Sequence, residues 1–213
     1  MLYEEGRFAN MKTKVEISND MWLFAPCVLI GLSLGIEYDW LVLLPTVILH
    51  ELGHYLAARI RRIPLLKIHI SLWGVRMNMG GILSYQDEFW LALGGPLANL
   101  LCAAISRLLL AVVPSPISDH LALFFSASVG LALFNLLPLG TLDGGRILSS
   151  VISRFFSPEA AHTVLSITTG LCLTLLWLFS AYALLKGAPM LSLFAFAMTF
   201  LLQYMTRTKE KTP

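Results

Sequence analysis

The hydrophobic residues of this chain are gathered in long blocks rather than at the short periods of a soluble domain. Six apolar blocks follow one another, at residues 22–36, 40–58, 89–113, 121–137, 164–185 and 190–204. The first is short but extends to ~17 residues, the lower limit for a transmembrane helix, and the others reach or approach that limit. The pattern predicts an all-α polytopic membrane protein with about six transmembrane helices.

Residues 65–84, between the second and third blocks, follow a different period. Polar and apolar residues alternate over 67–73 and again over 75–79, and two glycines follow. Alternation with a period of two favours strands. Because unpaired strand edges are not tolerated against lipid, we expect a small membrane-associated β-hairpin or short sheet that lies at the interface or lines a protein cavity.

Glycine and proline mark the places where helices should be interrupted or should begin. Residues 94–96 (Gly-Gly-Pro) interrupt the third block early, and Pro138 closes the fourth. Residues 143–146 (Asp-Gly-Gly-Arg) lead into a moderately apolar helix that ends near residue 156. Residues 157–159 (Ser-Pro-Glu) combine an N-cap residue with proline at the first helical position, which is a strong helix start.

Composition and charge support a membrane protein and give it an orientation. The chain is 57% hydrophobic and only 13% charged, against roughly 25% charged residues in soluble domains. With six spans, all the lysines and arginines except Arg107 and Lys186 fall on the side of both termini, so we expect both termini to be cytoplasmic. Residues 1–20 mix both charge signs and read as a short surface lead-in without a cleaved signal peptide, and we expect no nucleic-acid partner.

The candidate chemistry lies in the second apolar block, in the sequence His50-Glu51-Leu52-Gly53-His54. On a helix the two histidines project from one face, so both imidazoles can reach a single metal ion, and Zn²⁺ is the usual one for such ligands. Glu51 is next to them, where it can take a proton from water at the metal. Ionisable groups at membrane depth point to function by default.

Two histidines are one ligand short of a catalytic zinc site, and Asp143 is a candidate for the third. His54 lies five residues before Arg59, and Asp143 three residues before Arg146. Since both arginines should mark the cytoplasmic boundary, both candidate ligands come to similar depth on one side. From spacing alone, a helix cap remains an equally good interpretation of Asp143.

Two longer motifs carry a family resemblance. Residues 50–54, together with Asn135-x-x-Pro138 and Asp143-Gly144, resemble the site-2 protease family of intramembrane zinc metalloproteases, and residues 94–99 resemble a third family element. The match covers residues 40–150. The resemblance implies zinc ligands at His50, His54 and Asp143, the catalytic base at Glu51, and a residue that holds substrate or site near the metal at Asn135.

The third element leaves two interpretations open. It is either a close-packing kink or a site-lining element, and the candidate lining residues are Gly94, Gly95, Pro96 and Asn99.

The six spans, with one before the histidine-bearing helix, resemble the bacterial sporulation-type branch, whose members cleave a membrane-associated pro-form of a sigma factor. The resemblance implies a multi-pass protein of a bacterial cytoplasmic-type membrane, a membrane-tethered protein substrate, and room for an inhibitory membrane partner. We expect one transmembrane metalloprotease domain over residues 1–213, with its catalytic core at about 40–156. We expect neither an inserted PDZ domain nor a C-terminal regulatory domain.

The alternative function is a metal-ion carrier or transporter that uses the same histidine and aspartate site. The chain lacks the repeat symmetry of many transporters, and a glutamate directly beside the first ligand suits hydrolysis. For a protease, the substrate must be extended, because a helix buries its carbonyls. Residues 67–83 could offer a strand edge for that purpose, to be tested with proline at Ile70 or Val75.

Overall fold

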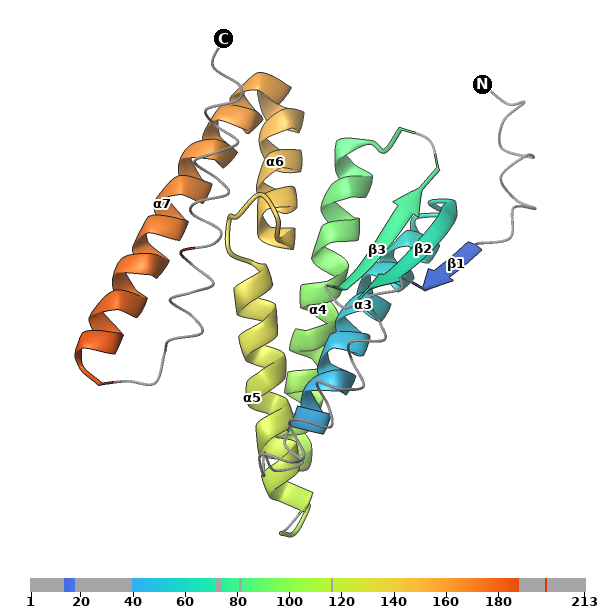
Figure 1. Ribbon diagram of the computed structural model, residues 1–213. Coiled ribbons are helices and arrows are strands. Elements are labelled where there is room, and N and C mark those ends of the chain that lie inside the picture. Colours follow the sequence, from blue (N-terminus) through green and yellow to red (C-terminus); the bar gives the residue numbers. More distant parts are fainter. Residues whose placement is uncertain are drawn as a thin grey trace. The chain divides into compact units, whose positions relative to one another are not determined.

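The computed structural model describes residues 14–17, 40–71, 74–80, 82–115, 117–187 and 198. The chain divides into two compact units, residues 1–135 and 136–213. The first unit contains helices α3 (Trp40–Ile60), α4 (Tyr85–Leu109) and α5 (Ile117–Asn135), with strands β1 (Lys14–Ile17), β2 (Leu65–Ser71) and β3 (Gly74–Met79) (Figure 1). The second contains α6 (Asp143–Phe155) and α7 (Pro158–Leu185).

Helices α3 and α4 cross at a pair of glycines that bring the two backbones into contact. A Cβ atom on Gly53 would lie 2.3 Å from the carbonyl oxygen of Gly94, and one on Gly94 would lie 2.6 Å from that of Gly53. The neighbouring residues at the crossing, Ala57 and Ala98, also have small side chains. Close approach through small residues is the usual way in which helices associate in lipid, where van der Waals packing replaces the hydrophobic effect.

The C-terminus of α3 is closed by a Schellman motif. Arg62 has a positive φ of 57°, and the N–H of Ile63 donates to the carbonyl of Ala58 at 2.9 Å. The side chains of Ile63 and Ala58 are both buried in the hydrophobic cluster with Leu65 and Leu91. The motif therefore ends the helix and turns the chain into β2.

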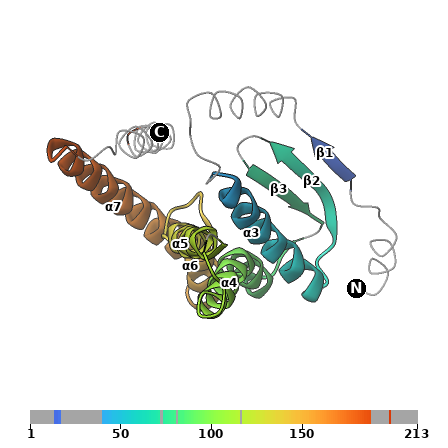
Figure 2. The ribbon, with the colours of Figure 1, turned by 90° about the horizontal axis from the view of Figure 1, so that it is seen from below.

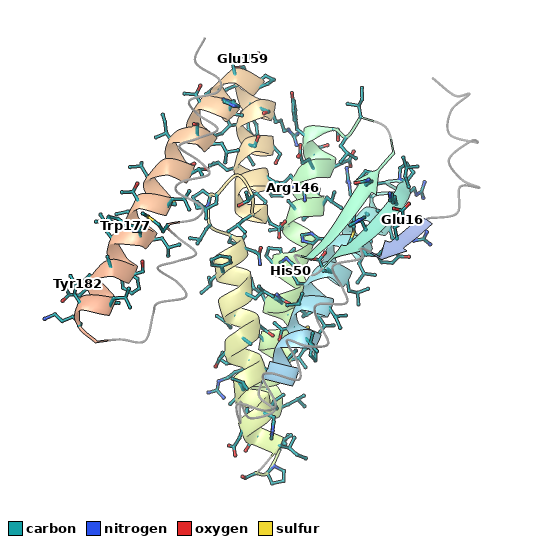
Figure 3. All side chains as sticks on the ribbon, viewed as in Figure 1. Glu16, His50, Arg146, Glu159, Trp177 and Tyr182 are labelled. Carbon is teal, nitrogen blue, oxygen red and sulfur yellow. The ribbon has the colours of Figure 1, made fainter. Side chains whose placement is uncertain are left out.

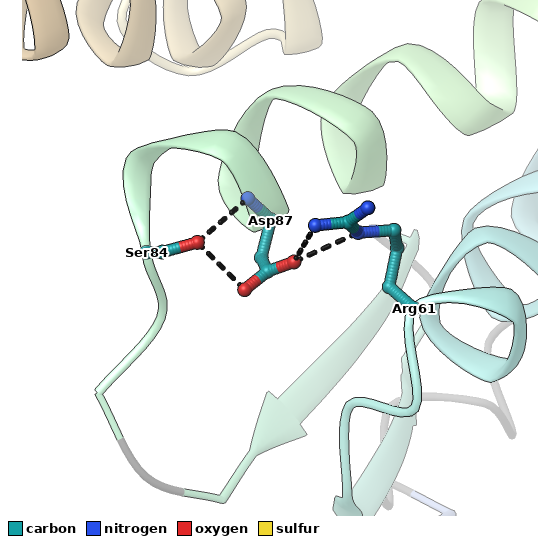
Figure 4. A network of polar contacts seen from close by, with 3 residues as sticks. All are labelled: Arg61, Ser84 and Asp87. Atoms are coloured by element: carbon teal, nitrogen blue, oxygen red, sulfur yellow. Dashed lines mark hydrogen bonds and ion pairs between the residues drawn. The ribbon is translucent and has the colours of Figure 1, made fainter.

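The N-terminus of α4 is fixed by a polar network that also reaches α3 (Figure 4). The Ser84 hydroxyl accepts a hydrogen bond from the Asp87 backbone N–H at 3.1 Å and donates to Asp87 Oδ2 at 2.6 Å. The Arg61 guanidinium holds Asp87 Oδ1 at 2.7 and 2.8 Å. This capping arrangement starts α4 at Tyr85. The helix therefore begins four residues before the apolar block at 89–113 from which it was predicted.

The interruption predicted at Gly94-Gly95-Pro96 is wrong, because α4 runs unbroken through these residues. Pro96 removes only the hydrogen bond to the carbonyl of Ala92. Gly94 and Gly95 are held from outside by the contact with α3. Tertiary packing thus overrides the weak helix propensity of this segment.

The predicted hairpin is present, and a third strand joins it. Strands β2 and β3 are antiparallel, and β1 pairs with β2 in parallel, so that the order is β1–β2–β3. Glu16 on β1 forms an ion pair with Lys67 on β2. The sheet lies beside α3 (Figure 2), where Met77 and Met79 pack against the hydrophobic cluster. The sequence predicted only a surface lead-in for residues 1–20.

In the second unit, the predicted helix start at residues 157–159 is confirmed. The Ser157 hydroxyl accepts a hydrogen bond from the N–H of Ala160 at 3.1 Å, and Pro158 occupies the first turn of α7. At the start of α6, a Cβ on Gly144 would lie 2.2 Å from the Leu136 carbonyl oxygen. The glycine therefore lets residues 136–139 lie against the first turn of α6.

Three of the described helices are long and apolar enough to cross a membrane, namely α4, α5 and α7. They correspond to the third, fourth and fifth apolar blocks. The second block forms α3, which is not among these three. The first and sixth blocks, residues 22–36 and 190–204, lie outside the described residues apart from residue 198. The number of six spans therefore stays a prediction.

Candidate metal centre

His50, labelled in Figure 3, lies on the side of α3 that faces α4. His54 is next to it and also contacts α4. Both are buried, with 5% and 8% of their surface exposed. Their Nε2 atoms are 3.2 Å apart, and the two rings are nearly perpendicular, with centroids 4.8 Å apart. The helical spacing of four residues thus brings two ring nitrogens to one point, as the sequence predicted.

The separation of the two Nε2 atoms fits two ligands of one zinc ion. Zinc–nitrogen bonds of ~2.0–2.1 Å at a tetrahedral angle place two ligand nitrogens about 3.3–3.4 Å apart, close to the 3.2 Å found here. The donor type fits as well, because neutral imidazole is a common zinc ligand. The pair therefore has the spacing of two ligands of one metal ion.

The orientation of His54 is fixed by a backbone group of α4. Its Nδ1 lies 2.7 Å from the carbonyl oxygen of Leu91. A carbonyl oxygen only accepts hydrogen bonds, so Nδ1 carries the proton and Nε2 presents a lone pair. Metal-ligating histidines usually donate their second ring nitrogen in this way.

Of the predicted site-lining residues, two on α4 meet the histidine pair directly. Asn99 is fully buried, with Nδ2 3.2 Å from Nδ1 of His50. A Cβ on Gly95 would lie 2.5 Å from Nε2 of His54 and 2.7 Å from Nε2 of His50. Gly94 instead forms the crossing with α3. Residues of this third sequence element therefore contact both α3 at the crossing and the two histidines, and its role in lining a functional site stays a prediction.

The remaining predicted site residues are placed by their own elements. Glu51 follows His50 on α3 and is partly buried. Asn135 is the last residue of α5, where its amide donates to the carbonyl of Leu131 at 3.0 Å. Asp143 is buried and is the first residue of α6; the N-cap is Leu142. The helix-cap interpretation of Asp143 is therefore wrong.

The Leu91 carbonyl is the group near the histidines that the sequence did not predict. Its role depends on the backbone of α4 and not on its side chain, so no residue type marks it. The N–H of Gly95 is the ordinary helical partner of this carbonyl, and the bare surface at Gly95 leaves the oxygen reachable from α3. Only the α3–α4 crossing at Gly53 and Gly94 could have indicated it.

Comparisons with known proteins agree with the resemblance seen in the sequence. Residues 111–177 match the model of Peptidase family M50. This segment contains Asn135, Pro138 and Asp143, and the histidine pair lies before it. The chain is 29% identical over 177 residues to Stage IV sporulation protein FB of Bacillus subtilis, which covers 80% of this chain and 58% of that protein.

An archaeal sequence and an archaeal structure extend the comparison. A zinc metalloprotease of Methanocaldococcus jannaschii is 29% identical over 161 residues, 72% of this chain and 47% of that protein. The solved structure of a site-2 protease from Methanocaldococcus jannaschii superposes with a TM-score of 0.64 at 23% identity and covers 90% of this chain and 89% of that one. The chain thus shares the fold of a site-2 protease, and it spans about half the length of the two sequence relatives.

These findings confirm the resemblance to the site-2 protease family and the integral membrane character of the chain. The three described helices that are long and apolar enough to cross a membrane agree with an integral membrane protein. Zinc is the metal named for one of the relatives, and it is the metal that the geometry of His50 and His54 fits.

Proposed function

Because the chain is related to Peptidase family M50 and has the fold of a site-2 protease, we propose that it is an intramembrane zinc endopeptidase. One observation carries the proposal. Two buried imidazoles of one helix present their Nε2 atoms 3.2 Å apart, and the neighbouring backbone fixes the tautomer of one of them. Buried ionisable groups in an integral membrane protein point to function by default.

His50, His54 and Asp143 form the proposed ligand set. A catalytic zinc site uses three protein ligands and leaves a fourth position for water or substrate. A carboxylate in the motif Asn135-x-x-Pro138-x-x-x-x-Asp143 completes that number. Asp143 opens α6, so α6 would bring its first turn to the metal, as the family resemblance implies.

Glu51 is the proposed catalytic base. Zinc, when bound, polarises the peptide carbonyl and makes water more acidic. The Glu51 carboxylate accepts the proton from the attacking water and returns it to the leaving amine. Asn135, at the end of α5, is proposed to hold the substrate or the site close to the metal, and Asn99 and Gly95 shape the wall on α4.

The substrate is proposed to be a membrane-tethered protein that is cleaved in or near its membrane-spanning segment. One relative is named for a stage of sporulation, so release of a regulator such as a pro-sigma factor is the proposed outcome. We further propose six spans, both termini on the cytoplasmic side, and one catalytic domain over the whole chain with its core at residues 40–156.

Strand β3 is the proposed docking edge for the extended substrate. It pairs with β2 on one side, and among the described residues no strand pairs with its other side. Main-chain pairing at such an edge binds an extended peptide with little dependence on its sequence. Ile70 is unsuitable for the proline test because it lies in the central strand, with Ile17 and Val75 as partners.

The proposal is tested by co-expression with a panel of single-span membrane proteins, comparing wild type with Glu51→Gln. We expect wild type to cleave at least one of them at a bond in or beside the span, mapped by mass spectrometry, and the variant to cleave none. The metal-carrier alternative predicts instead that zinc crosses vesicle membranes equally well with wild type and with Glu51→Gln. That result, without cleavage, would overturn the proposal.

A further inference from the structure

The amide of Asn99 meets the ring nitrogen of His50 that does not face His54. Asn99 is fully buried on α4, and its Nδ2 lies 3.2 Å from Nδ1 of His50. Its Oδ1 is also buried and has no hydrogen-bond partner among the residues that the structure describes. Because rotation of an amide by 180° exchanges its nitrogen and oxygen with little change in shape, either atom can face His50.

The two amide orientations require different positions of the proton on His50. If Nδ2 faces the ring, it donates to an unprotonated Nδ1, and the proton is on Nε2, from which it can donate to Nε2 of His54. If Oδ1 faces the ring, Nδ1 carries the proton and donates to Oδ1. The ring is neutral in both cases, and only the second leaves the Nε2 lone pair free for a metal ion.

We propose that Asn99 is a positioning residue of the metal centre. Its carbonyl oxygen accepts the Nδ1 proton of His50 and holds His50 in the tautomer whose Nε2 binds the metal. The Leu91 carbonyl does the same for His54 at 2.7 Å, so α4 supplies one acceptor to each of the two imidazoles on α3. The inference rests on the proposed function for the identity of the metal as zinc.

A matched pair of substitutions tests whether position 99 matters as a hydrogen-bond acceptor, as a hydrogen-bond donor or only through its size. Asn99→Asp keeps an acceptor at similar size but removes the N–H donors, and Asn99→Leu keeps the size but removes both. Ser106→Ala is the control, because Ser106 is buried on the same helix and donates a hydrogen bond to the Cys102 carbonyl, 2.8 Å away. The readout is the zinc dissociation constant of the purified full chain, measured by competition with a chelator.

Loss of a partner of this kind weakens metal binding by ~10–100-fold. We expect that loss in Asn99→Leu, no loss in Asn99→Asp, and wild-type binding in Ser106→Ala. Wild-type zinc affinity in Asn99→Leu would overturn the inference. Equal losses in Asn99→Asp and Asn99→Leu would also overturn it, because the donor or the amide shape would then be what matters.

A second measurement uses the wild-type chain and so does not depend on how the variants fold. In zinc-loaded protein labelled with ¹⁵N-histidine, we expect the His50 proton on Nδ1; a proton on Nε2 would overturn the inference. Proteolysis is read separately. Zinc binding and the Nδ1 tautomer without any cleavage would sink the proposed protease but leave the role of Asn99 intact. Cleavage by wild type, together with wild-type zinc affinity in Asn99→Leu, would support the proposed protease but overturn the role of Asn99.

Discussion

Gly95 lies so close to His54 that a Cβ atom at position 95 would be 2.5 Å from Nε2 of the imidazole. The same Cβ would lie 2.7 Å from Nε2 of His50. These are the two nitrogens that would bind the metal. The space next to these nitrogens exists because Gly95 has no side chain. At this point the backbone of α4 lies directly against the two imidazoles.

We therefore expect Gly95→Ala to weaken zinc binding by at least ~10-fold, the smaller loss usual for a disturbed metal environment. The methyl group would have to displace the ring nitrogens or the ion. Gly130→Ala is the control, because a Cβ on Gly130 of α5 would meet no atom of the described residues within 4 Å. That substitution should leave zinc binding unchanged. Unaltered zinc affinity in Gly95→Ala would contradict the placement of α4 against the histidines.

The backbone contact between Gly53 and Gly94 leads to a prediction about stability. Gly53→Ala would place a Cβ 2.3 Å from the Gly94 carbonyl oxygen, and overpacking of this kind costs ~1–3 kcal/mol. We expect unfolding in a detergent titration to become easier by that amount. Leu52→Ala, on the neighbouring half-exposed side chain, should have a smaller effect. Equal stability of Gly53→Ala and wild type would mean that the helices do not cross at this point.

Asp143→Asn tests the third ligand. An amide is a poorer zinc ligand than a carboxylate and brings no charge, so we expect zinc affinity to fall by more than the ~10–100-fold of a lost outer partner. Asp119→Asn changes an exposed carboxylate at the start of α5 and controls for the loss of one charge. Equal zinc affinities of Asp143→Asn and Asp119→Asn would remove Asp143 from the ligand set.

Proline substitutions on β3 test the substrate edge. Successive N–H groups of a strand point to opposite sides, so one of Val75 and Arg76 donates toward β2 and the other away from it. We expect one of Val75→Pro and Arg76→Pro to disrupt the hairpin. The other should keep stability and zinc content but lose cleavage, because it removes a donor for the substrate. Wild-type cleavage by the stable variant would exclude pairing at this edge.

The parts of the site that could be predicted from sequence are those that depend on side chains at fixed helical spacing. His50 and His54 follow from four residues of separation on one helix, and the hairpin from alternation over residues 67–79. Ser157 and Pro158 marked the start of α7 because capping is local chemistry. A similar signal was present at Ser84 and Asp87, where a serine precedes an acidic residue by three positions, and it would have placed the start of α4 correctly.

The parts that could not be predicted depend on contacts between distant segments. Strand β1 is only four residues long, and its partner β2 lies some fifty positions further on. The Leu91 carbonyl is a backbone group without a sequence signature. The continuity of α4 through Pro96 depends on its packing against α3, which helix propensity does not report. Asn99 was identified as a lining residue, but its bond to His50 needs the three-dimensional register of α3 and α4.

The central claim is that this chain is a zinc peptidase with Glu51 as its base. The most direct measurement is the zinc-to-protein ratio and the cleavage rate of the same purified samples of wild type and Glu51→Gln. We expect about one zinc per chain in both, since Glu51 is not a ligand, and cleavage only by wild type. Cleavage retained by Glu51→Gln, or zinc absent from both samples, would contradict the claim.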